Sequence, residues 1–183
     1  MEQTLVLIHN DAIQRGLVDE IKKRLTATGL KIIAEKEVVP TREMAEQHYR
    51  TTDEQYTSTG KKTIESMKID GYTPEGVIKL WGTEDPKKIG EQIIAFTREF
   101  IIGKKLIAMV LEGEDAVARV RKTVGATDPS RAEKGTIRGD LSDDSFKKAN
   151  PEKRKVRNLV HAADSVEKAK QEIELWFGKD MVR

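Results

Sequence analysis

Four short apolar runs that alternate with helical patterns place the tightest limit on how this chain can fold. The runs span residues 4–8, 30–39, 105–113 and 156–162, and each has the length of a strand. Between them, apolar residues recur at helical spacing. The clearest case is Ile89, Ile93, Phe96 and Phe100, at i, i+4, i+7 and i+11. The resulting order is strand, helix, strand, several helices, strand, helix, strand, helix.

That order predicts an α+β fold in which two βαβ-like halves surround a four-stranded antiparallel sheet, the ferredoxin-like pattern βαββαβ. The 183 residues are enough for a single domain with a sizeable core. Helices are expected at about residues 17–28, 41–49, 60–71, 73–82, 85–102, 115–124 and 164–177. A long loop is expected after Gly125.

Composition excludes several classes of protein. Charged residues make up 35% of the chain and the formal net charge is +2, too balanced to argue for nucleic acid or a membrane surface. The chain has no cysteine, which excludes disulfides, thiolate metal sites and cysteine nucleophiles and agrees with a cytoplasmic location. The N-terminal residues MEQTLVLIHND lack the basic region and apolar length of a signal peptide, and no segment reaches membrane-spanning length.

The segment RNLVHAADSVEKAKQEIELWF places His161 at the end of an apolar run, just before a predicted helix. Asp164 and Glu167 have the spacing of a capping box, which predicts that Asp164 caps this helix. Free N–H groups and the helix dipole favour an anion at such a place, so a histidine that transiently carries a phosphoryl group would suit it. The alternative is a histidine that only packs against the end of a strand.

Glu172 lies at the edge of the apolar stripe of the same helix, where its carboxylate could reach back to the strand. A carboxylate bonded to one ring nitrogen of a histidine fixes the tautomer and leaves the other nitrogen free as a nucleophile. The alternative for Glu172 is a solvated position on the flank of the helix.

Three residues upstream of the histidine could bind phosphate. Arg121 lies on a predicted helix, Thr127 in GATDP and Arg138 in GTIRGD. Two guanidinium groups and a hydroxyl that converged on one site would suit a di- or triphosphate. The alternatives are a solvated helix cation, a turn residue and an ion-pair partner of Asp140. Neither a GxxxxGK[ST] loop nor a GxGxxG motif is present, so any nucleotide must be held in another way.

The run FKKANPEKRKVR, residues 146–157, is rich in lysine and arginine and could bind nucleic acid. Only Phe146 adds an aromatic ring to it, and such a run is more often a solvated loop. A role in binding nucleic acid is therefore the less favoured interpretation.

Together these motifs resemble those of nucleoside diphosphate kinases. The segments QRGLVDEIKKRL, AMVLEG, GTIRGD and RNLVHAADSVEKAKQEIELWF occur in the order of that family, and the match covers roughly residues 1–49 and 104–177. The resemblance implies a ferredoxin-like fold and a Mg²⁺-dependent, ping-pong transfer of the γ-phosphoryl group between nucleoside tri- and diphosphates. It also implies a homo-oligomer, either a tetramer or a hexamer.

The resemblance implies roles for individual residues. His161 matches the histidine that becomes phosphorylated, and Glu172 matches the glutamate that orients it. Arg121, Thr127 and Arg138 match residues that hold the nucleotide phosphates.

Two further matches complete the implied site. Asn158 matches an asparagine that contacts the ribose, and Tyr49 matches the tyrosine of a His-Tyr pair near the reacting phosphate. The resemblance implies no side chain as a principal metal ligand, because the Mg²⁺ ion is held mainly by the nucleotide phosphates.

The chain departs from the family pattern at several positions. His9 stands where the family has a lysine that contacts phosphate and ribose, and a neutral imidazole supplies less positive charge. Ala163 removes a serine hydroxyl near the active histidine. Tyr56 takes the place of the phenylalanine that stacks on the base. Finally, the chain carries an extra helical insertion at about residues 57–100.

These departures leave two interpretations open. The chain is either an active nucleoside diphosphate kinase with a broad nucleotide range, or a catalytically weakened nucleotide-binding regulator on the same fold. If the site is active, either His9 is protonated beside the phosphates, or a lysine from the insertion, with Lys61 and Lys62 as candidates, reaches them instead.

Overall fold

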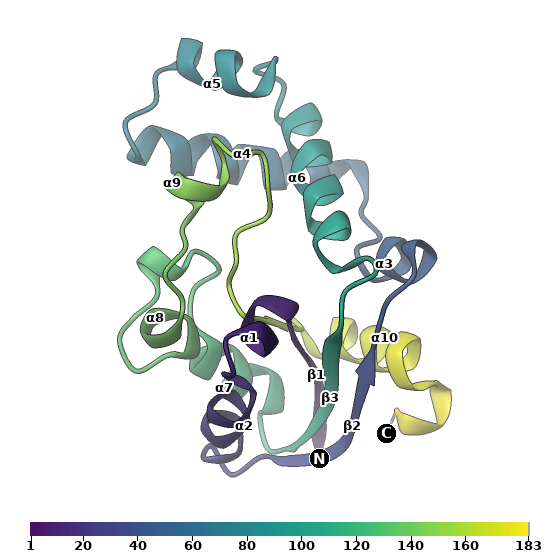
Figure 1. Ribbon diagram of the computed structural model, residues 1–183. Coiled ribbons are helices and arrows are strands. Elements are labelled where there is room, and N and C mark those ends of the chain that lie inside the picture. Colours follow the sequence, from purple (N-terminus) through teal and green to yellow (C-terminus); the bar gives the residue numbers. More distant parts are fainter. Residues whose placement is uncertain (183) are drawn as a thin grey trace.

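The computed structural model describes residues 1–182 and contains a four-stranded sheet in the order β2-β3-β1-β4 (Figure 1). The strands are β1 Glu2–Ile8, β2 Lys31–Val38, β3 Leu106–Gly113 and β4 Val160–Ala162. All the strand pairs are antiparallel. The arrangement confirms the predicted α+β, ferredoxin-like fold.

Helices cover the faces and one end of the sheet (Figure 1). They are α1 Asn10–Gln14, α2 Val18–Thr26, α3 Arg42–His48, α4 Asp53–Ile69, α5 Pro74–Trp81, α6 Pro86–Ile101, α7 Ala116–Val124, α8 Ile137–Leu141, α9 Phe146–Ala149 and α10 Val166–Phe177. Two 3-10 turns, η1 Pro129–Arg131 and η2 Lys179–Met181, complete the elements. Within residues 1–182, none of the helices has both the length and the apolar character needed to cross a membrane.

β1 lies at the centre of the fold. It pairs with β3 along one edge and with β4 along the other, and both of its faces are apolar. Val6 and Ile8 pack among side chains of α2 and α7. Leu5 and Leu7 point to the opposite face, where they pack with Trp176 of α10. β1 therefore joins two hydrophobic cores, and its C-terminal end carries the chain into the functional site.

Helices α4, α5 and α6 lie together beyond the end of the sheet at which β1 finishes (Figure 1). They have a hydrophobic cluster of their own, formed by Met67, Val77, Trp81 and Ile89. α4 and α6 approach closely because Gly60 has no side chain: a Cβ atom at this position would lie 1.7 Å from the carbonyl oxygen of Pro86. The segment predicted as an insertion thus forms a compact helical unit.

The ends of two helices differ from the sequence prediction. α4 begins at Asp53 rather than near residue 60, because Thr52 and Gln55 form a capping box that extends the helix toward its N-terminus. The prediction that Asp164 caps the last helix was wrong by one residue. Ser165 is the cap, and its hydroxyl accepts a hydrogen bond from the backbone N–H of Lys168 at 3.1 Å.

The segment after Gly125 is not the plain loop that the sequence predicted. It contains η1, α8 and α9, each capped by a side chain at its N-terminus. Helices of three to five residues are too short to produce an apolar period, so pattern analysis missed them.

Candidate active site

The backbone that carries His161 is held in an unusual conformation. Leu159, just before β4, has a φ of +70°, a region that residues other than glycine seldom adopt. Its carbonyl oxygen accepts a hydrogen bond from the N–H of His9 at 2.8 Å, and its N–H donates to the carboxylate of Asp11 at 3.2 Å. The end of β1 and the start of α1 therefore fix the strand that presents His161. Strain of this kind costs about 1–3 kcal/mol and tends to occur at functional sites.

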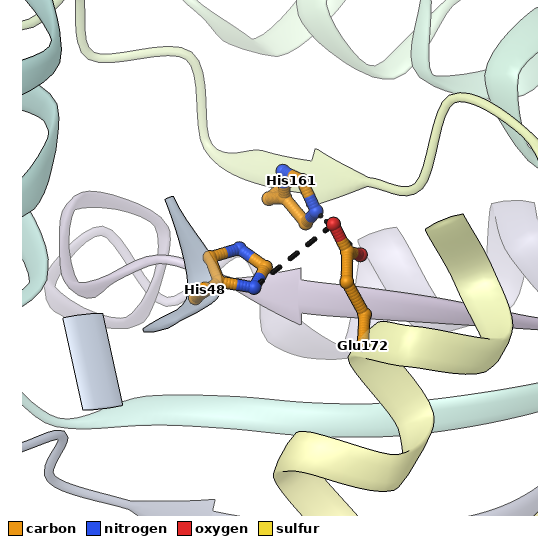
Figure 2. A group of neighbouring side chains, drawn as sticks. All are labelled: His48, His161 and Glu172. Carbon is orange, nitrogen blue, oxygen red and sulfur yellow. Dashed lines mark hydrogen bonds and ion pairs between the residues drawn. The ribbon is translucent and has the colours of Figure 1, made fainter. Parts of the chain in front are cut away.

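Glu172 orients the ring of His161. Its carboxylate is 3% exposed, and Oε2 lies 2.9 Å from Nε2 of His161 (Figure 2). A carboxylate only accepts hydrogen bonds, so Nε2 carries the proton and Nδ1 keeps its lone pair. Figure 2 shows this second ring nitrogen facing away from Glu172. The arrangement leaves Nδ1 available as a nucleophile.

A second histidine packs beside this pair. The ring centroid of His48, at the end of α3, lies 4.6 Å from that of His161, and the indole N–H of Trp176 donates to its Nδ1 at 3.1 Å. Burial lowers the pKa of His48 well below its usual range, and the neighbouring His161 acts in the same direction. His48 is therefore neutral at pH 7, and its 4.0 Å approach to Glu172 is a packing contact rather than an ion pair.

Tyr49 follows His48 and lines the same cleft. Burial, and then the negative charge of Glu172, raise the pKa of its hydroxyl above the ordinary value. The phenol therefore stays protonated at neutral pH and can donate a hydrogen bond.

The two arginines identified in the sequence differ in their surroundings. Arg138 is 8% exposed and donates to the backbone carbonyls of Gly125, Asn158 and Val160, at 2.9, 3.1 and 2.7 Å. Burial, and then the charge of Arg121, lower the pKa of Arg138 to about 10, so it remains charged at pH 7. Arg121 lies at the exposed end of α7 and lines the cleft. Arg138 thus ties the walls of the cleft together, while Arg121 presents its charge to the open space.

Asn158 and Thr127 lie next to each other on the cleft wall. Asn158 is buried, and its side-chain N–H donates to the carbonyl oxygen of Thr127 at 3.0 Å. Its amide oxygen accepts a hydrogen bond from Nζ of Lys155 at 3.0 Å. The amide is therefore fixed at both ends, and the Thr127 side chain remains exposed at the mouth of the cleft.

His9 is buried where the resemblance implied a phosphate-contacting lysine. It is 1% exposed, and both of its ring nitrogens lack a hydrogen-bond partner among the described residues. Burial lowers its pKa well below the usual range, and the charge of Lys155 acts in the same direction. With the cleft empty, His9 is neutral and supplies no positive charge.

Tyr56 does not lie in the cleft, in contrast to the expectation that its ring would stack on a base. It sits between α4 and α6, where its hydroxyl lies 3.4 Å from the guanidinium of Arg98. The cause is the unpredicted N-terminal extension of α4, which places position 56 on the face that packs against α6. Of the two candidate lysines of the insertion, Lys62 lines the cleft and Lys61 does not.

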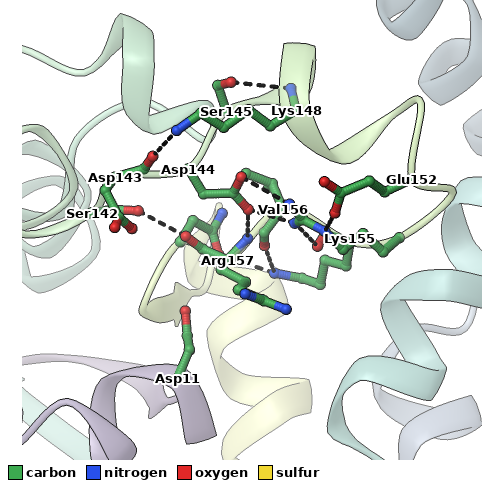
Figure 3. A network of polar contacts seen from close by, with 12 residues as sticks. Asp11, Ser142, Asp143, Asp144, Ser145, Lys148, Glu152, Lys155, Val156 and Arg157 are labelled. Atoms are coloured by element: carbon green, nitrogen blue, oxygen red, sulfur yellow. Dashed lines mark hydrogen bonds and ion pairs between the residues drawn. The ribbon is translucent and has the colours of Figure 1, made fainter.

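A network of polar contacts surrounds the basic run at residues 146–157 (Figure 3). Arg154 forms ion pairs with Asp144, at 2.6 Å, and with Glu152. Lys148 donates to the carbonyl oxygen of Asp143 at 2.7 Å. Burial opposes ionisation of Asp144, but hydrogen bonds from Arg154 and from backbone N–H groups hold its pKa below the ordinary value. These contacts give Arg154 and Asp144 a structural role in the loop.

The side chains described above surround a cleft of about 760 Å³ between the end of the sheet and helices α4 and α6. His9, Tyr49, Arg121, Thr127, Arg138, Asn158, His161 and Glu172 all line it. A nucleophilic imidazole nitrogen at the base of a cleft with several cations is suited to phosphoryl transfer, which depends on positioning and on positive charge around the phosphate oxygens.

Comparison with known proteins agrees with this geometry. The family model for nucleoside diphosphate kinase matches residues 2–69 and 59–182. The chain belongs to the nucleoside diphosphate kinase family. A nucleoside diphosphate kinase of Pyrobaculum aerophilum is 41% identical over 182 residues, which span 100% of this chain and 98% of the relative. One of Archaeoglobus fulgidus is 36% identical over 182 residues, spanning 100% and 90% of the two chains.

Solved structures give the same result. The crystal structure of the nucleoside diphosphate kinase of Pyrobaculum aerophilum superposes with a TM-score of 0.91 at 41% identity, covering 99% of this chain and 98% of that one. A transition-state mimic of the enzyme from Borrelia burgdorferi, with bound vanadate and ADP, superposes with a TM-score of 0.75 at 26% identity, covering 100% and 90%. Both the family and the enzyme class inferred from the sequence are therefore confirmed.

Sequence reasoning missed two residues of the site. His48 was visible in the His-Tyr pair at 48–49, but only the tyrosine was assigned a role. Lys155 could not be singled out, because it is one of several cations in the basic run. Only the structure distinguishes it from the others, since Lys155 lines the cleft and, among the described residues, forms no ion pair.

Proposed function

We propose that this member of the family transfers the γ-phosphoryl group of a nucleoside triphosphate to a nucleoside diphosphate through a phosphohistidine at Nδ1 of His161. The observation that carries the proposal is the 2.9 Å hydrogen bond between Glu172 and Nε2 of His161, which leaves Nδ1 as the unprotonated nitrogen.

In the first half-reaction, the lone pair of Nδ1 attacks the γ-phosphorus. The bond from this phosphorus to the β,γ-bridging oxygen breaks, and the nucleoside diphosphate leaves with the electron pair. In the second half-reaction, a terminal oxygen of an acceptor diphosphate attacks the phosphorus and the N–P bond breaks. Glu172 accepts a hydrogen bond from Nε2 throughout and stabilises the positive charge that develops on the ring.

The cations of the cleft would bind the nucleotide phosphates. Arg121 contributes an exposed guanidinium, and Arg138 retains N–H groups beyond the three that bind backbone carbonyls. Thr127 adds a hydroxyl at the mouth of the cleft. The protonated phenol of Tyr49 lies beside His161, with ring centroids 6.2 Å apart, where it can donate to the transferred phosphoryl group.

Magnesium is proposed as the cofactor. The described residues that line the cleft include two carboxylates, Asp164 and Glu172, and Glu172 already binds His161. The donor set therefore fits an ion held mainly by phosphate oxygens and water, as Mg²⁺ commonly is. Such an ion would neutralise part of the phosphate charge when bound.

The proposal extends to the setting of the enzyme. Nucleoside di- and triphosphates are its substrates. Nucleic acid is an unfavoured partner, because the basic run contains a single aromatic residue, Phe146. From family membership we further propose a homo-oligomer, a tetramer or a hexamer, in the cytoplasm. Sedimentation of the purified chain measures the oligomeric state.

Steady-state kinetics test the proposed function. With ATP as donor and GDP as acceptor, varying both substrates should give the parallel double-reciprocal lines of a ping-pong mechanism. His161→Ala should abolish turnover while ADP binding stays within a few-fold of wild type. Intersecting lines, or more than a few per cent of turnover in the variant, would contradict a phosphohistidine intermediate.

A further inference from the structure

Lys155 occupies an unusual position for a lysine. It lies in the loop between α9 and β4, is half-buried, and lines the cleft. Its Nζ atom donates to the amide oxygen of Asn158 at 3.0 Å and lies 4.7 Å from the ring centroid of Phe100. Its other hydrogen-bond partner is the carbonyl oxygen of Val156, at 3.4 Å. Within residues 1–182, no carboxylate forms an ion pair with it.

Its neighbour Arg154 provides a contrast within the same loop. Arg154 is paired with Asp144 and Glu152, as expected of a half-buried cation in a structural role. The ammonium of Lys155 instead touches neutral acceptors and an aromatic face. A partly desolvated cation that lacks an anion is unfavourable in the empty protein and is ready to accept one.

His9 adds a second, independent feature to the same place. Its ring packs edge-on against Phe100 at a centroid distance of 5.3 Å, so His9 and Lys155 contact the same phenylalanine. Both ring nitrogens of His9 are buried without a partner. An imidazole with no hydrogen-bond partner among the described residues and an ammonium bonded only to neutral acceptors therefore both line the cleft and contact Phe100.

The electrostatics of the empty cleft agree with this picture. Burial, and then the charge of Arg138 on α8, lower the pKa of Lys155 to about 7. Asp11 of α1 and Asp144 act in the opposite direction but are outweighed. The other titratable neighbour, His9, is neutral because its own pKa lies well below the usual range.

Building on the proposed function, we propose that Lys155 is the ammonium that contacts the nucleotide phosphates in this chain. It reaches the cleft from the loop before β4 and takes the place of the lysine that His9 replaces at the end of β1. Arg121 and Arg138 line the same cleft, so Lys155 would join their guanidinium groups in binding the phosphates. The bound phosphates would supply the anionic partner that the ammonium of Lys155 lacks in the empty cleft.

A purely structural role for Lys155 is the competing explanation. Its hydrogen bond to Asn158 could serve only to hold that amide, which in turn binds the carbonyl oxygen of Thr127. The two explanations differ in what a lysine at position 9 would do. An ammonium placed there can replace the charge of Lys155, but it cannot restore the loop contact to Asn158.

The test is ADP binding, measured by calorimetry on the full chain in the presence of Mg²⁺. K155M should weaken ADP binding by about ten- to a hundredfold, the range for a hydrogen bond to a charged group. K147M removes the same charge from an exposed lysine of α9, just before the loop, and should change binding by less than about twofold. The double variant H9K/K155M should recover most of the affinity lost in K155M.

The pH dependence gives a second readout. Bound phosphate favours the protonated ammonium, so wild-type affinity should fall as the pH rises above about 7, by up to about tenfold per pH unit. K155R carries a permanent charge and should lose this fall.

Several outcomes would overturn the assignment. ADP binding in K155M equal to wild type removes Lys155 from the phosphate site. Weakened binding in K155M without rescue by H9K, and with the same pH dependence in K155R as in wild type, identifies a structural role only. If wild type and K155M bind ADP and turn over equally well, this inference alone is contradicted. If the wild type neither binds ADP nor turns over, the proposed function is contradicted as well.

Discussion

The Oε2 atom of Glu172 lies 2.9 Å from the Nε2 atom of His161, and this contact joins α10 to β4 at the base of the cleft. It depends on the burial of Glu172, which is 3% exposed, beside a histidine that is only partly buried. The contact determines which nitrogen of His161 can react, so replacing Glu172 should affect the reaction.

Glu172→Gln should lower kcat by about a hundredfold with little change in ADP affinity. The amide is uncharged, so it cannot stabilise the positive ring that develops during transfer, and its N–H groups can bond Nε2 in the wrong tautomer. Single-turnover phosphorylation by ATP measures the effect. Glu172→Asp keeps the charge on a shorter side chain and serves as the control. Equal rates in the Gln variant and wild type would show that the carboxylate does not assist the reaction.

Replacing Arg121 and replacing Arg138 should have different effects on stability. Arg121→Ala should weaken ADP binding by about tenfold or more and leave stability nearly unchanged, because the side chain is exposed. Arg138→Ala should reduce binding and also destabilise the fold by about 2–4 kcal/mol, since three backbone carbonyls lose their donor. Urea unfolding and ADP calorimetry on the same samples distinguish the two. A stable Arg138→Ala variant would contradict the structural part of its role.

The close approach of α4 and α6 predicts a contrast between two glycines. Gly60→Ala should destabilise the protein by about 1–3 kcal/mol, because the new Cβ would lie 1.7 Å from the carbonyl oxygen of Pro86. Gly76→Ala, within α5, has no neighbour nearer than 3.5 Å and should stabilise by about 0.5–1 kcal/mol. Denaturant midpoints measure both changes. Equal midpoints would mean that the two helices are not packed as closely as described.

Two buried histidines predict that stability falls in mild acid. The pKa values of His9 and His48 in the folded protein lie well below the usual value, mainly because of burial. The unfolded chain therefore binds protons that the folded chain excludes, so stability is full above about pH 6.5 and decreases below it. The slope is up to about 1.4 kcal/mol per pH unit for each histidine.

Urea unfolding between pH 7.5 and 5 measures this slope. The glutamine of His48→Gln cannot take up a proton. The variant should therefore lose the contribution of one histidine to the slope, whatever its effect on stability at pH 7.5. An unchanged slope in this variant would mean that His48 takes up a proton as readily in the folded protein as in the unfolded chain.

The sequence predicted the parts of the fold that rest on repeated patterns. The stripe at Ile89, Ile93, Phe96 and Phe100 lies within α6, and the apolar run at 4–8 lies within β1. These predictions held because burial of a continuous face determines such elements. α8 and α9 were missed, because single capping contacts rather than periodicity determine helices of four or five residues.

Sequence-based prediction of the site was limited for a different reason. His161 and Glu172 are eleven residues apart, so one helix and one turn bring them together, and local reasoning could anticipate their contact. The direction of Lys155 and the displacement of Tyr56 toward α6 both depend on packing between distant segments. Nothing in the local sequence around either residue encodes that packing.

The position of the phosphoryl group on His161 tests the central claim most directly. The wild-type chain is incubated with ATP and Mg²⁺, freed of nucleotide, and kept at alkaline pH, and the phosphohistidine is then located by intact mass and by ³¹P and ¹⁵N NMR. The hydrogen bond at Nε2 predicts one phosphoryl group per chain, on Nδ1 of His161, that is labile in acid and passes to GDP on addition. A phosphoryl group on Nε2, on another residue, or on no residue of an otherwise ADP-binding chain would contradict the account.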